Sequence, residues 1–157
     1  LSFRMSELKG LKKSDIHNRV ITVNRAMVYV NGEYVEKHST KTPSSRRKLV
    51  TPDYIYSLIE QLPEEQEYLV TLSGAQIYQR FTHLLEINNI PHTTFHDLRS
   101  INASVMLMLG IPDKYAMERG GWETDCILKS VYQQTFSAER QEVDRKIDAY
   151  FESLREA

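Results

Sequence analysis

The spacing of apolar residues changes at Pro52, and this change constrains the fold more than any other feature of the sequence. Before Pro52, runs rich in β-branched and aromatic residues predict strands over 20–24, 27–30 and 47–51. Asn31-Gly32 follows the second run, and this pair is typical of a tight hairpin because both of its residues must adopt positive φ. We therefore expect a small antiparallel sheet of about three strands near the N-terminus.

Beyond Pro52 the apolar residues recur at the spacing of helices. The expected helices cover 52–62, 74–88, 94–109, 112–119, 124–131 and 137–154, and a shorter one over 5–13 precedes the strands. Thr94 and Asp97 have the spacing of a capping box, and Gly110 and Gly120-Gly121 stand where helix C-termini favour glycine. The predicted fold class is mainly α, with a small three-stranded antiparallel β-sheet near the N-terminus.

The composition is that of a globular domain. The 157 residues suffice for one domain with its own core, since 41% of them are hydrophobic. Cys126 is the single cysteine, which excludes an internal disulfide and fits a reducing cytoplasm. No apolar run reaches the roughly 18 residues of a membrane span, and the N-terminus has no signal-peptide layout. Because the chain opens at Leu1 without an initiator Met, we expect a fragment of a longer protein.

Positive charge is concentrated near the N-terminus. The net charge of the chain is −1, yet residues 1–50 hold 11 of the 20 Lys and Arg residues and 4 of the 21 Asp and Glu residues. This division is typical of a basic face that binds a polyanion, and equally of a solvated basic surface. If the polyanion is DNA, the candidate contacts are Lys12, Lys13, Arg46 and Arg47.

His96 and Arg99 are the first candidates for chemistry. They are three residues apart at the start of a predicted helix, so both side chains project from one face beside a helix N-terminus, which favours an anion. An arginine fork and a proton-exchanging histidine suit a phosphate, although a plain surface pair has the same pattern. His92 and His96 have the spacing of a zinc pair, but Pro91 places His92 before the helix, so we expect no metal site.

Two downstream positions make the pattern specific. Trp122, preceded by Gly121, follows His96 by 26 residues, and Tyr132 follows Trp122 by 10. The series His-x-x-Arg, Gly-(His/Trp) and Tyr at these intervals resembles the motif of tyrosine recombinases of the phage-integrase type.

Two upstream segments extend the resemblance. The family's Arg-(Ile/Met/Leu)-Ser-Glu-Leu box resembles Arg4-Met5-Ser6-Glu7-Leu8. The segment 40–47 resembles the family's β-hairpin segment, with Lys41 in the place of its catalytic lysine. Five boxes therefore occur in the family's order. The resemblance implies the tyrosine recombinase catalytic-core fold over 1–157, with the DNA-binding domains that usually precede it in the family absent.

The resemblance also implies a role for each box. A tyrosine phenol has a pKa of about 10, so it needs a proton acceptor or a cationic site before it attacks phosphorus. Tyr132 would be that nucleophile, and Lys41 the acid that protonates the departing 5′ oxygen. Arg4 and Arg99 would hold the non-bridging oxygens, where negative charge develops.

His96 and Trp122 would complete the site. His96 would hydrogen-bond the phosphate or accept the tyrosine proton, and Trp122 would supply an N–H donor and an apolar wall. A tryptophan after a Gly-Gly turn is also compatible with plain packing. Lys37 and Lys48 are close to Lys41 in the sequence and are alternatives to it.

The function implied is site-specific DNA recombination through a 3′-phosphotyrosine intermediate, for integration and excision of a prophage or other mobile element, with no cofactor. The partners would be double-stranded DNA and further copies in a DNA-bound tetramer. The helix predicted over 137–154 would cover the domain's own core or dock on a neighbouring copy. The alternatives are a type IB topoisomerase, a non-catalytic DNA-binding relative and a metal-dependent hydrolase. The His96 and Trp122 boxes disfavour the first, the complete set of boxes the second, and the lack of a ligand set the third.

Overall fold

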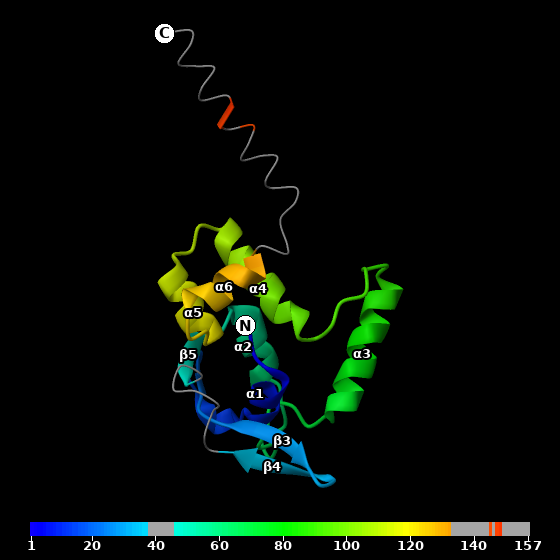
Figure 1. Ribbon diagram of the computed structural model, residues 1–157. Coiled ribbons are helices and arrows are strands. Elements are labelled where there is room, and N and C mark those ends of the chain that lie inside the picture. Colours follow the sequence, from blue (N-terminus) through cyan, green and yellow to red (C-terminus); the bar gives the residue numbers. More distant parts are fainter. Residues whose placement is uncertain (38–45, 133–144, 146, 149–157) are drawn as a thin grey trace.

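A computed structural model describes residues 1–37, 46–132, 145, 147 and 148. The strands are β1 (Ile16–His17), β2 (Val20–Val23), β3 (Ala26–Val30), β4 (Glu33–Lys37) and β5 (Arg47–Val50). The helices are α1 (Met5–Gly10), α2 (Asp53–Glu60), α3 (Gly74–Ile87), α4 (Asp97–Met108), α5 (Asp113–Gly120) and α6 (Asp125–Tyr132), with a short 3-10 helix, η1 (Lys13–Asp15). Figure 1 shows α4, α5 and α6 grouped at one end, the hairpin of β3 and β4 at the other, and α1 between them. The predicted Lys41 and nearly all of the predicted helix 137–154 lie outside the described residues.

The expected three-stranded antiparallel sheet is present, but not all of its strands are the predicted ones. The strands form a three-stranded antiparallel sheet in the order β1-β2-β5 and a separate hairpin of β3 with β4. The break falls at Asn24 and Arg25, between β2 and β3. Their side chains donate to the carboxylate of buried Asp15, at 3.2 Å and 2.7 Å. Because these bonds hold the link between β2 and β3 against η1, β3 leaves the first sheet and pairs with β4 alone.

The hairpin turn itself follows the sequence. Asn31 has a φ of 51° and Gly32 a φ of 92°, as the two central positions of a tight turn require. Val28 pairs with Val35, and Tyr29 with Tyr34. The hydroxyl of Tyr34 accepts a hydrogen bond at 2.9 Å from the backbone N–H of Gly74, the first residue of α3. The hairpin is thereby tied to the start of α3.

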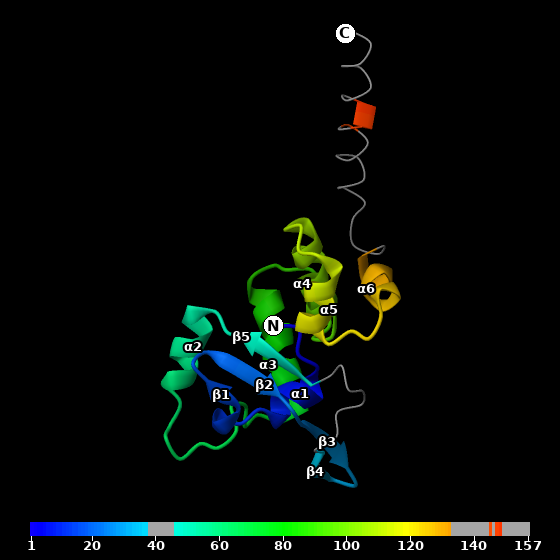
Figure 2. The same ribbon diagram turned by 90° about the vertical axis from the view of Figure 1, so that its left-hand side faces the viewer.

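Two clusters of buried side chains form the interior. The first lies under the three-stranded sheet and comprises Leu11, Ile21, Val23 and Leu49. The second joins the helices α4, α5 and α6 and comprises Ala103, Met106, Ala116, Trp122 and Leu128. Figure 2 shows the sheet and the three helices as neighbouring layers, with the N-terminus close to their boundary. The site described below lies at that boundary.

The ends of α4 match the capping signals. The backbone N–H of Thr94 donates to Asp97 at 2.7 Å, and the N–H of Asp97 donates to the Thr94 hydroxyl at 3.2 Å, which is the predicted reciprocal box. At the other end Gly110 has a φ of 67°, and the N–H of Ile111 donates to the Met106 carbonyl at 2.9 Å. These bonds fix where α4 begins, and therefore where His96 and Arg99 lie.

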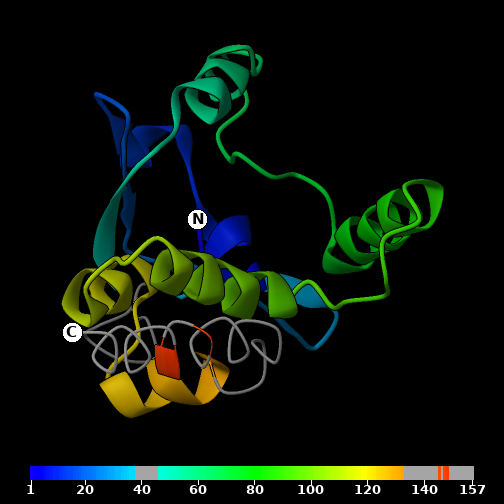
Figure 3. The same cartoon turned by 90° about the horizontal axis from the view of Figure 1, so that it is seen from above.

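The helices α2 and α3 contribute little to the interior. No residue of α2 is buried, and Leu85 is the one buried residue of α3. Seen from above, α4 lies between α6 on one side and α2 on the other (Figure 3). An apolar groove of about 430 Å³ separates α2 from α1 and is lined by Leu8, Ile55, Leu58 and Phe95 among others. Among the described residues, no helix has both the length and the apolar character that crossing a membrane requires.

Candidate active site

The N-terminal segment connects the two interior clusters. The hydroxyl of Ser2 donates to the Asn102 side chain of α4 at 2.6 Å. The carbonyl of Ser2 accepts from Arg99 Nη1 at 2.5 Å and from Arg47 Nη2 at 3.2 Å. One peptide group therefore contacts α4 and β5 at once, and it places the next residues, including Arg4, at the boundary.

Arg99 is a buried cation in the first turn of α4, at this boundary. Its residue exposure is 5%, and its guanidinium lies 4.6 Å from the ring centroid of Trp122. Burial and, secondarily, repulsion from Arg4 lower the pKa of Arg99 to about 10, so it stays charged at neutral pH. Its Nη2 is buried and makes no hydrogen bond among the described residues. Such a donor is costly unless an acceptor fills the space beside it.

Arg4 lies at the N-terminus of α1 and is held by Glu7. Its Nη1 pairs with Glu7 Oε1 at 2.6 Å, and its backbone N–H donates to Glu7 Oε2 at 2.9 Å. The Arg4 side chain is 35% exposed, so solvent or a ligand can still reach it. Arg4 and Arg99 thus approach the boundary from α1 and α4, and Arg4 is close enough for its charge to depress the pKa of Arg99.

Glu7 also binds a second arginine. Its Oε2 accepts from Arg47 Nη2 at 2.9 Å, and both side chains are almost fully buried. Burial acts to raise the pKa of Glu7, but the hydrogen bonds and charges of Arg47 and Arg4 outweigh it and hold that pKa below its usual range. The pair is therefore ionised in the interior.

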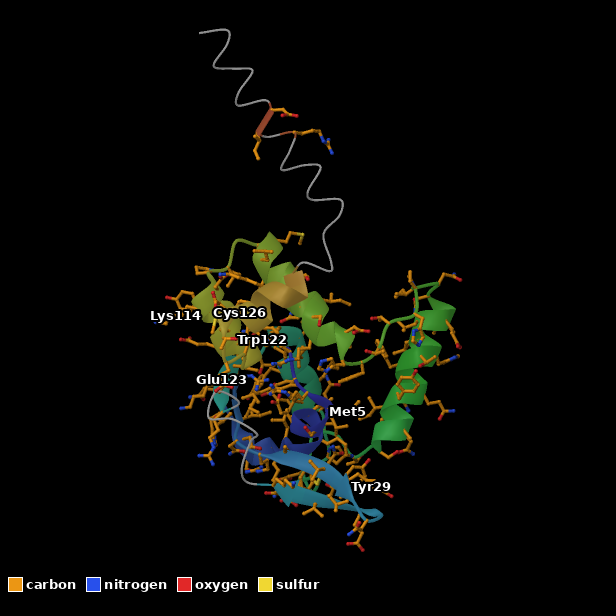
Figure 4. The ribbon with its side chains drawn as sticks, in the orientation of Figure 1. Met5, Tyr29, Lys114, Trp122, Glu123 and Cys126 are labelled. Atoms are coloured by element: carbon orange, nitrogen blue, oxygen red, sulfur yellow. The ribbon has the colours of Figure 1, made fainter. Side chains whose placement is uncertain are left out.

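Trp122 reaches the boundary through the end of α5. Gly121 has a φ of 65°, and the N–H of Trp122 donates to the Met117 carbonyl at 3.1 Å, which closes the helix and turns the chain inward. A Cβ added at Gly120 would overlap the indole ring, so glycine is required for the ring to lie against the helix. Figure 4 shows Trp122 between the group α4, α5, α6 and the helix α1, which carries Met5.

The remaining predicted site residues are placed only in part. His96 is exposed at the N-terminal boundary of α4, one helical turn before Arg99. Tyr132 is the last residue of α6, and its side chain is outside the described part. Lys41 is outside it altogether. The structure thus brings Arg4, Arg99 and Trp122 together, with His96 on the same helix as Arg99, and the roles of all six residues stay predictions.

Two of the predicted DNA contacts bind the protein itself. Lys12 pairs with Glu67 at 2.9 Å and with Glu36 at 3.0 Å, and these partners, Glu67 first, raise its pKa. Lys13 Nζ donates to the backbone carbonyls of residues 62 and 63. To contact DNA, each lysine would have to exchange these partners for phosphate.

Arg46 and Arg47 lie on opposite faces of the chain at β5. Arg46 is exposed and Arg47 is buried. A groove of about 670 Å³ opens beside Trp122, and its lining includes the exposed cations Arg46, Lys48 and Lys114 together with Glu118. Figure 4 shows Lys114 projecting from the outer side of α5. From the sequence, Lys48 was named only as an alternative to Lys41, and Lys114 was not named; the fold brings Lys114 to the same groove as Arg46 and Lys48.

Acidic and imidazole groups do not converge on a metal-binding set within the described ranges: no group of three or more His, Cys, Asp or Glu side chains comes together there. The described part of the site consists of the guanidinium groups of Arg4 and Arg99 and the Trp122 indole, with the Glu7 carboxylate holding Arg4. Such a site suits an oxyanion with several equivalent oxygens, above all a phosphodiester.

Comparison with known proteins identifies the family. The Phage integrase family matches residues 2–139. An integrase of Saccharopolyspora erythraea is 25% identical over 131 residues, covering 71% of this chain and 30% of the relative. An integrase of Staphylococcus phage L54a is 24% identical over 169 aligned positions, covering 92% of this chain and 48% of the relative. The chain thus spans about half, or less, of the length of these curated relatives.

Solved structures give the fold. The Tn1549 transposon integrase in complex with circular intermediate DNA has a TM-score of 0.71 to this chain at 22% identity, covering 92% of this chain and 56% of that one. The XerA recombinase has a TM-score of 0.66 at 18% identity, covering 91% and 51%. The fold is therefore that of the catalytic part of the tyrosine recombinases. The family match over most of the length makes the assignment more specific: the chain belongs to the phage integrase family.

Proposed function

We propose that this chain is the catalytic domain of a site-specific DNA recombinase that breaks and rejoins strands through Tyr132. The observation that carries the proposal is the convergence of Arg4, Arg99 and Trp122 at the boundary of the two interior clusters, in a member of the phage integrase family. Arg99 Nη2, a buried donor with no protein acceptor in the described part, would meet a non-bridging phosphate oxygen. Membership of an integrase family favours integration and excision of a mobile element.

The proposed chemistry is a reversible phosphoryl transfer. The Tyr132 oxygen attacks phosphorus and gives its proton to His96. The bond from phosphorus to the 5′ oxygen breaks, and Lys41 protonates that oxygen. Arg4 and Arg99 offset the charge on the equatorial oxygens, so no metal or other cofactor is invoked. Attack by a 5′-hydroxyl of a partner strand then expels Tyr132 and reseals the DNA without ATP.

The duplex would run along the basic groove beside Trp122. Arg46, Lys48 and Lys114 line this groove and would contact the backbone phosphates, while the Glu118 carboxylate among them offsets part of their mutual repulsion. We expect self-association as a tetramer on DNA, in which the segment 137–154 contacts a neighbouring copy. DNA as substrate also implies work in the cytoplasm.

The test is a covalent adduct. The protein, as its gene encodes it, is incubated with nicked duplexes tiled across the DNA flanking that gene, in EDTA, and run on a denaturing gel. We expect a protein–DNA adduct that Tyr132→Phe abolishes and that the matched change Tyr54→Phe, on the 69% exposed tyrosine of α2, leaves intact. An adduct that survives Tyr132→Phe, or one that requires a divalent metal, would contradict the proposal. Relaxation of supercoiled plasmid without site preference would favour the topoisomerase alternative.

Binding gives an independent check. Tyr132→Phe should bind the same duplexes as the unmodified protein, with affinity that falls steeply as salt rises, because phosphate contacts release counterions. Salt-insensitive binding would show that the basic groove does not hold the backbone.

A further inference from the structure

Arg47 makes a set of interior contacts that a surface DNA contact would not. Its side chain is 4% exposed. Its Nε donates to the Arg119 carbonyl at 3.0 Å, and its Nη2 donates to Glu7 Oε2 at 2.9 Å and to the Ser2 carbonyl at 3.2 Å. Its guanidinium also lies 5.7 Å from the Phe3 ring centroid. The planar fork thus joins three separate segments of the chain.

Each of the three acceptors controls one predicted site residue. Glu7 holds Arg4 through both its backbone N–H and its side chain. The Ser2 carbonyl accepts the hydrogen bond from Arg99 Nη1 that fixes this guanidinium beside Trp122. The third acceptor belongs to the residue that directly precedes the glycine pair leading to Trp122.

β5 holds Arg47 firmly in this position. Arg47 pairs in the sheet with Val23, which is fully buried, and Leu49 on the same face of β5 is 2% exposed. Because successive side chains of a strand point to opposite faces, Arg46 and Lys48 project outward and are exposed. Arg47 also lines the basic groove, but with a side chain that is only 4% exposed. The strand therefore presents cations to solvent on one face and one interior cation on the other.

We propose that Arg47 is a positioning residue that sets the mutual geometry of Arg4, Arg99 and Trp122 and does not touch DNA. The inference rests on the proposed function, since the geometry it sets is that of the phosphate site. An ammonium in the place of the guanidinium keeps the charge beside Glu7 but lacks the fork that reaches the Ser2 and Arg119 carbonyls. Arg47→Lys should therefore keep the fold and lose the alignment of the two arginines.

The experiment compares cleavage of two suicide duplexes, one with an ordinary scissile phosphate and one with a methylphosphonate, which lacks the negative charge. Arg47→Lys is set beside the unmodified protein and beside Arg80→Lys, the same change at an exposed arginine of α3. At saturating DNA we expect Arg47→Lys to cleave the phosphate about 100-fold more slowly, the loss that a misplacement of about 1 Å brings. The methylphosphonate should be slowed much less, because misaligned cations matter less to an uncharged group, whereas Arg80→Lys should slow neither.

Binding separates positioning from contact. The dissociation constant and its salt dependence should be unchanged in Arg47→Lys, whereas loss of a phosphate contact would reduce the salt slope by about 1. A reduced slope, or equal slowing of both substrates, would overturn the inference. If Arg47→Lys does not fold, Glu7→Gln takes its place, because it weakens the same link from the acceptor side. Glu7→Gln should reduce the ratio of the cleavage rate of the phosphate duplex to that of the methylphosphonate duplex. An unchanged ratio of rates in the folded variant would also overturn the inference. Absence of a Tyr132 adduct in the unmodified protein would instead refute the proposed function.

Discussion

Gly120→Ala should dislodge the single tryptophan of the chain. The added Cβ would overlap three carbons of the Trp122 ring, which is 7% exposed and packed in the cluster of α4, α5 and α6. Relieving the overlap means moving either the ring or the end of α5, at about 1–3 kcal/mol for an overfilled core. Alanine offsets at most about 1 kcal/mol of this through its higher helix propensity. The net loss is therefore at most about 3 kcal/mol, and each kcal/mol lost lowers the melting temperature by roughly 2–4 °C for a chain of this length.

Fluorescence excited at 295 nm reports the ring directly, because the sequence holds one Trp. In Gly120→Ala we expect red-shifted emission and easier acrylamide quenching, together with the lower melting temperature. The matched control is Gly110→Ala. Gly110 lies just beyond the end of α4, whereas Gly120 is the last residue of α5. Gly110 has a φ of 67°, but a Cβ there meets nothing within 4 Å among the described residues, so the strain is confined to the backbone. The control should lose stability with unchanged emission. Unchanged emission and stability in Gly120→Ala would refute the packing account of the Gly-Gly pair.

Two further outcomes follow from the contacts. The folded-state pKa of Glu7 lies below 4.5, so its ion pairs contribute stability that is present above about pH 4.5 and lost as pH falls through the folded pKa. In urea unfolding between pH 7 and pH 3, the free energy of unfolding of Glu7→Gln should therefore fall less with decreasing pH than that of the unmodified protein. An equal fall in both proteins would contradict the assignment. Leu128→Ala should lower the free energy of unfolding by about 2–5 kcal/mol and loosen α6, which carries Tyr132, because Leu128 is fully buried against α4 and α5. Limited proteolysis near α6 should then be faster than in the control, Lys129→Ala, which changes an exposed residue of the same helix. Equal resistance of the two variants to proteolysis would contradict this prediction.

Local signals in the sequence predicted the helix ends well. The helix predicted over 94–109 begins three residues before α4 and ends one residue after it, because the Thr94 and Asp97 box and Gly110 act through hydrogen bonds between neighbours in the chain. The Asn31-Gly32 turn is of the same kind. The partition of strands between two sheets was not predictable in this way. It depends on Asp15 capturing the link after β2, and nothing in local sequence says which side chain an aspartate will meet.

The candidate site shows the same division. The intervals between His96, Arg99 and Trp122 could be matched to a family motif, and the folded chain places Arg99 against Trp122. Counting charges along the sequence carries less information about contacts. It treats Lys12 as a cation available to DNA, whereas two carboxylates from distant segments already pair with it. A net charge by segment contains no information about partners that only the fold brings near.

Arg46, Arg47 and Lys48 show that part of the missing information was nevertheless present. Taken as three adjacent cations they suggest one basic patch. Taken as the first two residues of the strand predicted over 47–51 and the residue just before it, they alternate, so Arg47 shares a face with Leu49, and Lys48 shares the other face with Arg46. A leucine in a β-rich run favours the buried side, which leaves Arg47 needing an interior anion. Glu7, inside a box already matched to the family, meets that need. Charge and periodicity considered together therefore separate the cations that can face DNA from the one that holds the site in place.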